Sequence, residues 1–178
     1  MRRAFAHHRP TRGRRGFTFI EVGITTAIIG LGMSALVTLM ASSTKANYTA
    51  TELTTAMNLA NNIHELTERL AFADGHWGMD TGETIATCNS CDDLAGLRLG
   101  ASGTSVVDAI GQAMPTASGM SWTGWQQQIA VTLVDPTNLQ TALASTDTTN
   151  NNVMRITCTI VHNGNQVYQQ AWNVVQTK

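Results

Sequence analysis

The stretch that decides the fold reads RRGFTFIEVGITTAIIGLGMSALVTLMASST and covers residues 14–44. From Phe17 to Thr44 it holds 28 residues and a single charged side chain, Glu21. A membrane-spanning helix needs about 20 mostly apolar residues, so this run is long enough. Glycines weaken helices in water but are common in transmembrane helices, and this run contains Gly23, Gly30 and Gly32. The sequence therefore predicts a transmembrane helix over residues 17–44.

Arginines before this helix predict its orientation. Residues 1–16 form a basic leader with six arginines, whereas only Lys45 stands just beyond the helix. By the positive-inside rule, the N-terminus is expected in the cytoplasm and the rest of the chain across the membrane. A buried core helix is a poorer interpretation because such helices rarely run this long without a charge. A cleaved secretory signal is also a poorer one, since signal cores usually have 7–15 apolar residues followed by an A-x-A-like site.

The net charge of −1 at pH 7 is the sum of a basic leader and an acidic remainder. Residues 1–16 carry +6, and residues 17–178 carry five basic and twelve acidic side chains, which gives −7. A uniformly basic nucleic-acid binder is therefore excluded. The acidic remainder also argues against binding of nucleic acid by charge alone.

Glu21 is the most informative residue of the apolar run. An acid within a membrane segment is costly and usually marks a function or a specific partner. No Lys, Arg or His lies between residues 17 and 44. A cationic partner must therefore come from another chain or from a new N-terminus made by proteolysis. In the alternative interpretation, Glu21 is close enough to the cytoplasmic interface to reach water there.

Residues 14–22, RRGFTFIEV, resemble the prepilin signature of type IV pilins and type II secretion pseudopilins. That signature is a short basic leader, a glycine, and Phe-Thr-Leu-Ile-Glu opening a hydrophobic helix, and this chain has Phe19 where leucine is usual. The resemblance implies cleavage between Gly16 and Phe17 by a prepilin peptidase and N-methylation of Phe17. It also implies a role for Glu21 in filament assembly.

The resemblance further implies the partners and the location of the chain. The partners would be other pilin or pseudopilin subunits and an inner-membrane assembly platform. The chain would pass once through the inner membrane, with its exported domain in the periplasm or in an extracellular filament. In a staggered bundle, the new amine at Phe17 of one subunit could pair with Glu21 of its neighbour, so that each charge lowers the burial cost of the other. Residues 56–66, AMNLANNIHEL, resemble the equivalent region of minor pilins and I-type minor pseudopilins.

Beyond the membrane segment, residues 45–72 predict an amphipathic continuation of the helix. Apolar side chains recur there every three or four residues, and Asp74-Gly75 provides an expected stop. The predicted apolar face consists of Leu53, Met57, Ala60, Ile63, Leu66 and Leu70.

Residues 73–178 are expected to form an exported domain with an antiparallel sheet. Residues 129–134, 153–162 and 167–175 alternate as strands do, and Asn163-Gly164 predicts a type I′ hairpin turn. Residues 73–127 hold nine glycines and indicate many turns, and residues 136–152 read as a long polar connection. The predicted fold class is α+β: a long N-terminal helix, half transmembrane and half amphipathic, packed on a small sheet as in pilins.

Aromatic side chains in the loop-rich part have two interpretations. Trp77, Trp122 and Trp125 either pack this part against the helix or form an aromatic surface for a ligand. Packing is the favoured interpretation.

The cysteines also leave alternatives open. Cys88 and Cys91 form a C-x-x-C, and Cys158 lies in a predicted strand. The favoured interpretation is a structural disulfide in an oxidising compartment, with any pairing possible and one cysteine left over. The alternatives are free or buried thiols, or a zinc site completed by His76 or His162.

Acidic residues beside the C-x-x-C raise the question of calcium. Asp92 and Asp93 could bind Ca²⁺ together with Asp80 or Glu83. No D-x-[DN]-x-[DN]-G loop is present, so solvated acids in a turn are the favoured interpretation and no metal is expected.

Motifs of catalysis are lacking in the sequence. It has no G-x-S-x-G, H-E-x-x-H, P-loop or G-x-G-x-x-G, so neither an enzyme nor a cofactor is expected. The first functional hypothesis is a structural subunit of a type IV pilus or type II secretion pseudopilus. The alternative is a tip-located minor pilin that acts as a binding module for a surface or a secreted cargo. An enzyme anchored by an uncleaved helix is the third hypothesis.

Overall fold

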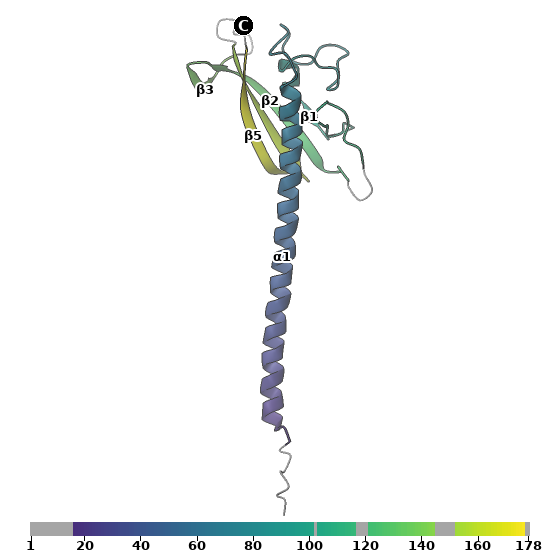
Figure 1. The fold of residues 1–178 in the computed structure, drawn as a ribbon, viewed down its shortest axis with the longest axis vertical. Helices are drawn as coiled ribbons and strands as arrows, with labels where there is room; N and C mark the ends of the chain where they lie inside the picture. Colours follow the sequence, from purple (N-terminus) through teal and green to yellow (C-terminus); the bar gives the residue numbers. More distant parts are fainter. Residues whose placement is uncertain (1–15, 102, 117–120, 145–151, 177–178) are drawn as a thin grey trace, which may run out of the picture. The chain divides into compact units, whose positions relative to one another are not determined.

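In the described part of the chain, the main elements are a long helix and an antiparallel sheet (Figure 1). The computed structural model describes residues 16–101, 103–116, 121–144 and 152–176. The fold is α+β with a long N-terminal helix, as the sequence predicts. In chain order the elements are α1 (Phe19–Thr67), the 3₁₀ turn η1 (Asp92–Leu94), β1 (Arg98–Leu99), β2 (Trp125–Asp135), β3 (Asn138–Ala142), β4 (Val153–His162) and β5 (Asn165–Val175).

The chain divides into two units, one up to Asn47 and one from Tyr48 onwards. In the described residues of the first unit, every side chain of α1 is exposed. Within the part of the chain that the structure describes, α1 is the one helix long and apolar enough to cross a membrane. Its hydroxyls donate to carbonyls one turn back, as in Thr25 Oγ1 to the Glu21 carbonyl at 2.7 Å and Thr38 Oγ1 to the Ser34 carbonyl at 2.9 Å. These bonds remove the cost that unpaired hydroxyls would have in lipid.

The helix ends at Thr67, and the prediction that it continues to residue 72 was therefore too long. The Thr67 hydroxyl donates to the His64 carbonyl at 2.7 Å, which satisfies a backbone acceptor of the last turn. Beyond it, the Ala71 N–H donates to the Asn89 carbonyl at 3.0 Å. The Ala71 carbonyl accepts from the Cys91 N–H at 2.9 Å. Tertiary pairing with residues 89–91 thus takes the backbone groups that a longer helix would use.

The buried face of α1 differs in part from the predicted one. Leu53 and Met57 are 41% and 42% exposed, although the sequence placed them in the apolar face. Met57 follows Ala56 by about 100° around the helix, which moves it beyond the buried arc. Small side chains lie within that arc and let the sheet approach closely. The buried residues of α1 are Ala56, Leu59, Ala60, Ile63, Leu66 and Thr67.

The sheet is antiparallel with the order β1-β2-β4-β5, and β3 pairs with the end of β2. The strand predicted over residues 153–162 is confirmed with its bounds. The turn between β4 and β5 has positive φ at both Asn163 (50°) and Gly164 (82°), which confirms the predicted type I′ turn. Two other strands begin before their predicted bounds, β2 at Trp125 and β5 at Asn165. The predicted connection 136–152 contains the short strand β3.

The core of the second unit lies between α1 and one face of the sheet (Figure 1). As predicted, the inward side chains of β4 are buried, and those of β5 are partly buried against the same core. The outward faces of these strands carry mainly Gln, Thr, Asn and Ala. The inward residues are Met154, Ile156, Cys158 and Ile160 of β4, and Tyr168, Trp172 and Val174 of β5.

The tryptophans of the loop-rich part pack against this core, which confirms the favoured interpretation. Trp125 is buried, and its ring stacks on that of His162 with centroids 4.2 Å apart. Trp77 and Trp122 are partly buried against the same core. The Trp122 indole N–H donates to the Pro115 carbonyl at 3.1 Å, which gives its polar atom a partner.

A buried amide joins three parts of this unit. Gln127 of β2 is fully buried. Its Nε2 donates to the carbonyls of Leu59 in α1 and of Val107 in the loop, each at 3.0 Å. Its Oε1 accepts from the Val107 N–H at 2.7 Å. Both donors of the side chain and its acceptor are therefore satisfied inside the core.

Replacement of Gln127 by alanine is expected to lower the free energy of unfolding by about 3 kcal/mol. The substitution leaves the buried Val107 N–H without its acceptor and opens a cavity. Equilibrium unfolding of the full chain in detergent, followed by tryptophan fluorescence, measures the loss. Gln126→Ala, one residue away on the outer face, is the matched control, with an expected change within about 0.5 kcal/mol. Equal losses in the two variants would contradict this role of Gln127.

Candidate functional site

Residues 16–18 precede the first turn of α1, and they contain the predicted processing site. Gly16, Phe17 and Thr18 are not helical, and the Phe17 side chain is 77% exposed. The bond between Gly16 and Phe17 therefore lies in irregular, accessible backbone immediately before the helix. This geometry suits cleavage by a peptidase, and cleavage and N-methylation at these residues stay predictions.

Glu21 has a local partner that sequence reasoning missed. Its carboxylate Oε2 accepts from the Thr18 N–H at 3.5 Å, and its own N–H lies 3.4 Å from Thr18 Oγ1. Thr18 directly precedes the helix and Glu21 is its third residue, so the pair has the form of a capping box. The Thr-x-x-Glu spacing was the signal that could have revealed it. The carboxylate also lies at the positive end of the helix dipole, which favours its charge.

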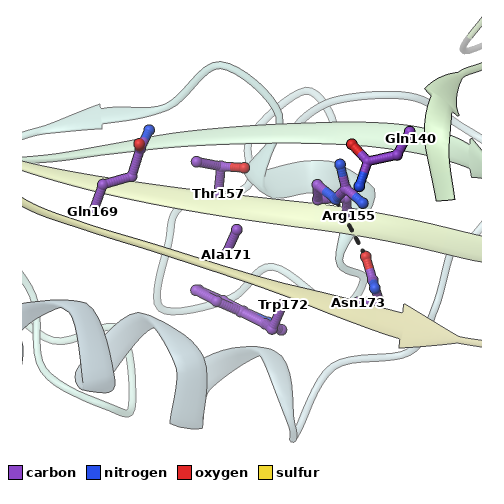
Figure 2. Close-up of a pocket in the computed structure, with 7 residues that line it drawn as sticks. All are labelled: Gln140, Arg155, Thr157, Gln169, Ala171, Trp172 and Asn173. Carbon is purple, nitrogen blue, oxygen red and sulfur yellow. Dashed lines mark hydrogen bonds between the residues drawn. The ribbon is translucent and has the colours of Figure 1, made fainter.

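A polar groove lies on the outer face of the sheet in the second unit (Figure 2). Its volume is about 510 Å³. The lining comes from β3, β4 and β5 and consists mainly of amides, hydroxyls and one cation. The lining residues are Gln140, Arg155, Thr157, Gln169, Ala171, Trp172 and Asn173.

Arg155 provides the positive charge of this groove. Its Nη2 donates to the Leu139 carbonyl at 2.6 Å, and its Nε donates to Asn173 Oδ1 at 3.4 Å. None of the ion pairs among the described residues includes it. The Trp172 ring lies on the opposite side of the strands in Figure 2, where its indole N–H donates to Thr67 Oγ1 at 3.1 Å. The groove therefore offers hydrogen bonds and a cation rather than an aromatic surface.

The three cysteines lie in the core as free thiols in the structure. Burial raises the pKa of Cys88 from 9.0 to about 11, with the charges of Asp93 and Glu83 adding to the effect. Burial also raises the pKa of Cys91 and of Cys158 to about 12. The charges of Asp92, Cys88 and Asp93 add to the effect of burial at Cys91, whereas burial alone acts on Cys158. The disulfide stays a prediction, and its pairing stays open.

The zinc alternative finds no support in the positions of the histidines. His162 Nδ1 lies 2.6 Å from Glu52 Oε1, and His76 Nδ1 lies 2.9 Å from Asp80 Oδ1. Among the described residues, a single group of His, Cys, Asp and Glu side chains is close enough to hold a metal ion, and it contains no cysteine or histidine.

That group corrects the interpretation of the acids beside the C-x-x-C. Asp92 and Asp93 are buried, with 3% and 0% exposed, whereas the sequence indicated solvated acids. The acid grouped with them is Asp74, rather than Asp80 or Glu83. The Asp93 carboxylate is turned inward because its Oδ2 accepts backbone N–H groups from Asn89 and Ser90.

Alkylation of the reduced, folded chain is expected to be slow and strongly dependent on pH. At pH 8, the fraction present as thiolate is roughly 100-fold smaller for a cysteine of pKa about 11 than for an ordinary cysteine. The rate should therefore rise tenfold per pH unit up to about pH 11. Mass spectrometry of iodoacetamide adducts against time measures it, with the reduced chain in 6 M guanidinium as the control. Equal rates in the folded and unfolded chains would contradict the burial of the thiols.

Comparisons of the chain with protein-family models, with curated proteins and with solved structures found no significant match.

Proposed function

We propose that this chain is a structural subunit of a type IV pilus or a type II secretion pseudopilus, processed between Gly16 and Phe17. The observation that carries the proposal is the arrangement at the start of α1. A non-helical Gly-Phe-Thr precedes an apolar helix, and the first turn of that helix holds the one acid of the run. The resemblance of residues 14–22 to the prepilin signature supports the same conclusion.

The exposed apolar surface of α1 supports assembly through this helix. Phe19 is 95% exposed and Leu31 is 72% exposed, and such a surface needs lipid or other helices to cover it. Gly23, Ala27 and Gly30 share one face of the helix, and small residues on one face let a second helix approach closely. The helix thus has the properties needed both before assembly, in a membrane, and after it, against neighbouring subunits.

The α+β second unit suits the exported part of such a subunit. A long apolar helix joined to a small antiparallel sheet is compatible with a pilin-like fold. In this proposal the subunit is retained in the inner membrane with its N-terminus in the cytoplasm, and its partners are the prepilin peptidase, other subunits and an assembly platform. No catalytic activity is required.

The groove beside Arg155 favours a second candidate, in which the same subunit also binds a ligand at the filament tip. Amides and hydroxyls surround the guanidinium there. A ligand would be recognised through hydrogen bonds and through a negative charge placed near Arg155. Adhesion to a surface and contact with a secreted cargo are both forms of this candidate.

Processing is expected to leave methylphenylalanine at position 17 as the N-terminus of the membrane form. The chain expressed in cells that contain a prepilin peptidase should lose residues 1–16 and gain one methyl group, and mass spectrometry of the intact protein detects both changes. Cells that lack the peptidase provide the control and should retain the leader. An intact Met1 terminus in peptidase-containing cells would refute the proposed function.

Glu21→Gln separates the two roles of this residue. Glutamine can still form the capping box, so helix formation and membrane insertion should be unchanged. It removes the charge that would pair with the amine of a neighbouring subunit, so incorporation into filaments should fall at least tenfold. Immunoblotting of sheared filaments against the membrane fraction measures this ratio.

Thr18→Ala is the matched control for that substitution, because it removes the capping hydroxyl and keeps the carboxylate. This variant should assemble far better than Glu21→Gln. Normal incorporation of Glu21→Gln would contradict the charge-pairing role, and a failure of Thr18→Ala alone would assign Glu21 to capping.

A further inference from the structure

Three carboxylates meet where the segment after α1 contacts η1. Asp74 follows the end of the helix, and Asp92 and Asp93 form the first residues of η1. One oxygen from each side chain lies within 4.8 Å of one oxygen from each of the others. The two segments are held together by the bond from the Cys91 N–H to the Ala71 carbonyl, at 2.9 Å. The cluster is therefore fixed by backbone pairing and does not depend on a chance approach of mobile side chains.

Three oxygens at this place are buried without a partner. Ser90, Asp92 and Asp93 are between 0% and 3% exposed. Ser90 Oγ, Asp92 Oδ1 and Asp93 Oδ1 make no hydrogen bond within the described chain. The other oxygen of Asp93 is fixed by the N–H groups of Asn89 and Ser90, at 3.2 and 3.0 Å. Buried polar groups normally have a partner, so these oxygens indicate that something is to be bound between them.

Positive charge is missing from the cluster. Neither of the ion pairs among the described residues includes Asp74, Asp92 or Asp93. Buried carboxylates without a cation are strongly unfavourable. A bound cation would remove the repulsion and satisfy the open oxygens together.

We propose that Asp74, Asp92 and Asp93 bind one Ca²⁺ ion, with the Ser90 hydroxyl beside it. Every available donor is a hard oxygen, which selects Ca²⁺, Mg²⁺ or Mn²⁺ over softer metals. The acids come from two irregular segments, and Ca²⁺ accepts irregular sets of six to eight oxygens completed by carbonyls and water. Mg²⁺ requires near-ideal octahedral geometry at shorter distances and retains most of its water.

The neighbouring thiols do not compete for this role. Cys91 Sγ donates to the Thr67 carbonyl at 3.6 Å, and Cys88 Sγ donates to the Ile85 carbonyl at 3.3 Å. A thiol must lose its proton to become a metal ligand. Both protons are engaged with backbone carbonyls, so the oxygen cluster is a site of its own beside the C-x-x-C. This proposal does not depend on the assembly of the chain into a filament.

Calcium titration of the full-length chain in detergent, first stripped with EDTA, tests the site. Isothermal titration calorimetry with CaCl₂ should show one ion per chain, with a Kd of about 10⁻⁴–10⁻³ M as in extracellular modules. At ten times Kd, Ca²⁺ should raise the Tm by about 5 °C, since it binds only the folded state.

Two variants and a control test which residues bind the Ca²⁺ ion. Asp74→Asn and Asp92→Asn should each weaken Ca²⁺ binding at least tenfold and abolish the rise in Tm. In EDTA, Asp92→Asn should unfold at the same temperature as the unaltered chain or above it, because it removes an unpaired buried charge. Glu68→Gln has the same change in charge at an exposed position near the end of α1, and it should keep both the affinity and the rise in Tm.

The outcomes that overturn the proposal are equally specific. No heat and no rise in Tm with the unaltered chain would refute a calcium site. Unchanged Ca²⁺ binding and an unchanged rise in Tm in Asp74→Asn would refute this location. Asp74 is exposed, so this variant should fold even if Asp92→Asn does not. An equal rise in Tm with MgCl₂ at the same concentration would refute the assignment to Ca²⁺.

Discussion

The side-chain amide of Gln127 is the interaction on which the arrangement of the second unit depends. It bonds α1 at the Leu59 carbonyl and the loop at both backbone groups of Val107, while its own backbone belongs to β2. A buried amide of this kind is stable only where all its partners are present, so it fixes which turn of the helix lies against the sheet. That position places Ala56 and Ala60 in the contact and leaves Met57 beyond its edge.

Regular alternation of apolar and polar residues could be predicted from the sequence, whereas the burial of polar residues such as Gln127 could not. The strand over residues 153–162 could be predicted because its inward residues are apolar and its outward ones polar, and Asn163-Gly164 specifies the turn that follows. The start of β2 could not, because Gln127 is a polar residue in an inward position and hides the alternation. Asp93 is a similar case, since its burial depends on backbone N–H groups that only the folded loop brings together. A hydropathy pattern cannot predict the burial of polar side chains that form hydrogen bonds with backbone groups.

In the first turn of α1, Glu21 has an observed local role and a proposed intermolecular one. The sequence leaves two interpretations of Glu21 open: a cationic partner from outside the apolar run, which contains no cation, or contact with water at the cytoplasmic interface. The structure adds that Glu21 and Thr18 cap the helix. The two roles are compatible, because a capping carboxylate is held at the helix start, and the proposed cleavage would place a free amine four residues away along the same chain. A neighbouring subunit's amine would then meet a carboxylate whose position is already restricted, which reduces the conformational entropy lost on pairing.

The other end of α1 presents the opposite electrostatic problem. A helix C-terminus carries partial negative charge, and Cys91 Sγ contacts the carbonyl of Thr67, the last residue of α1. Asp92 follows Cys91 directly, so the acidic cluster lies close to a pole of the same sign. Lysine or arginine in the last turn would normally offset this pole, yet the basic residue there is His64, which packs edge-on against Trp172. Arg69, two residues beyond the end of α1, donates to the Ala109 carbonyl. A divalent ion bound between the acids, as proposed, would offset both the carboxylates and the partial negative charge of the helix end.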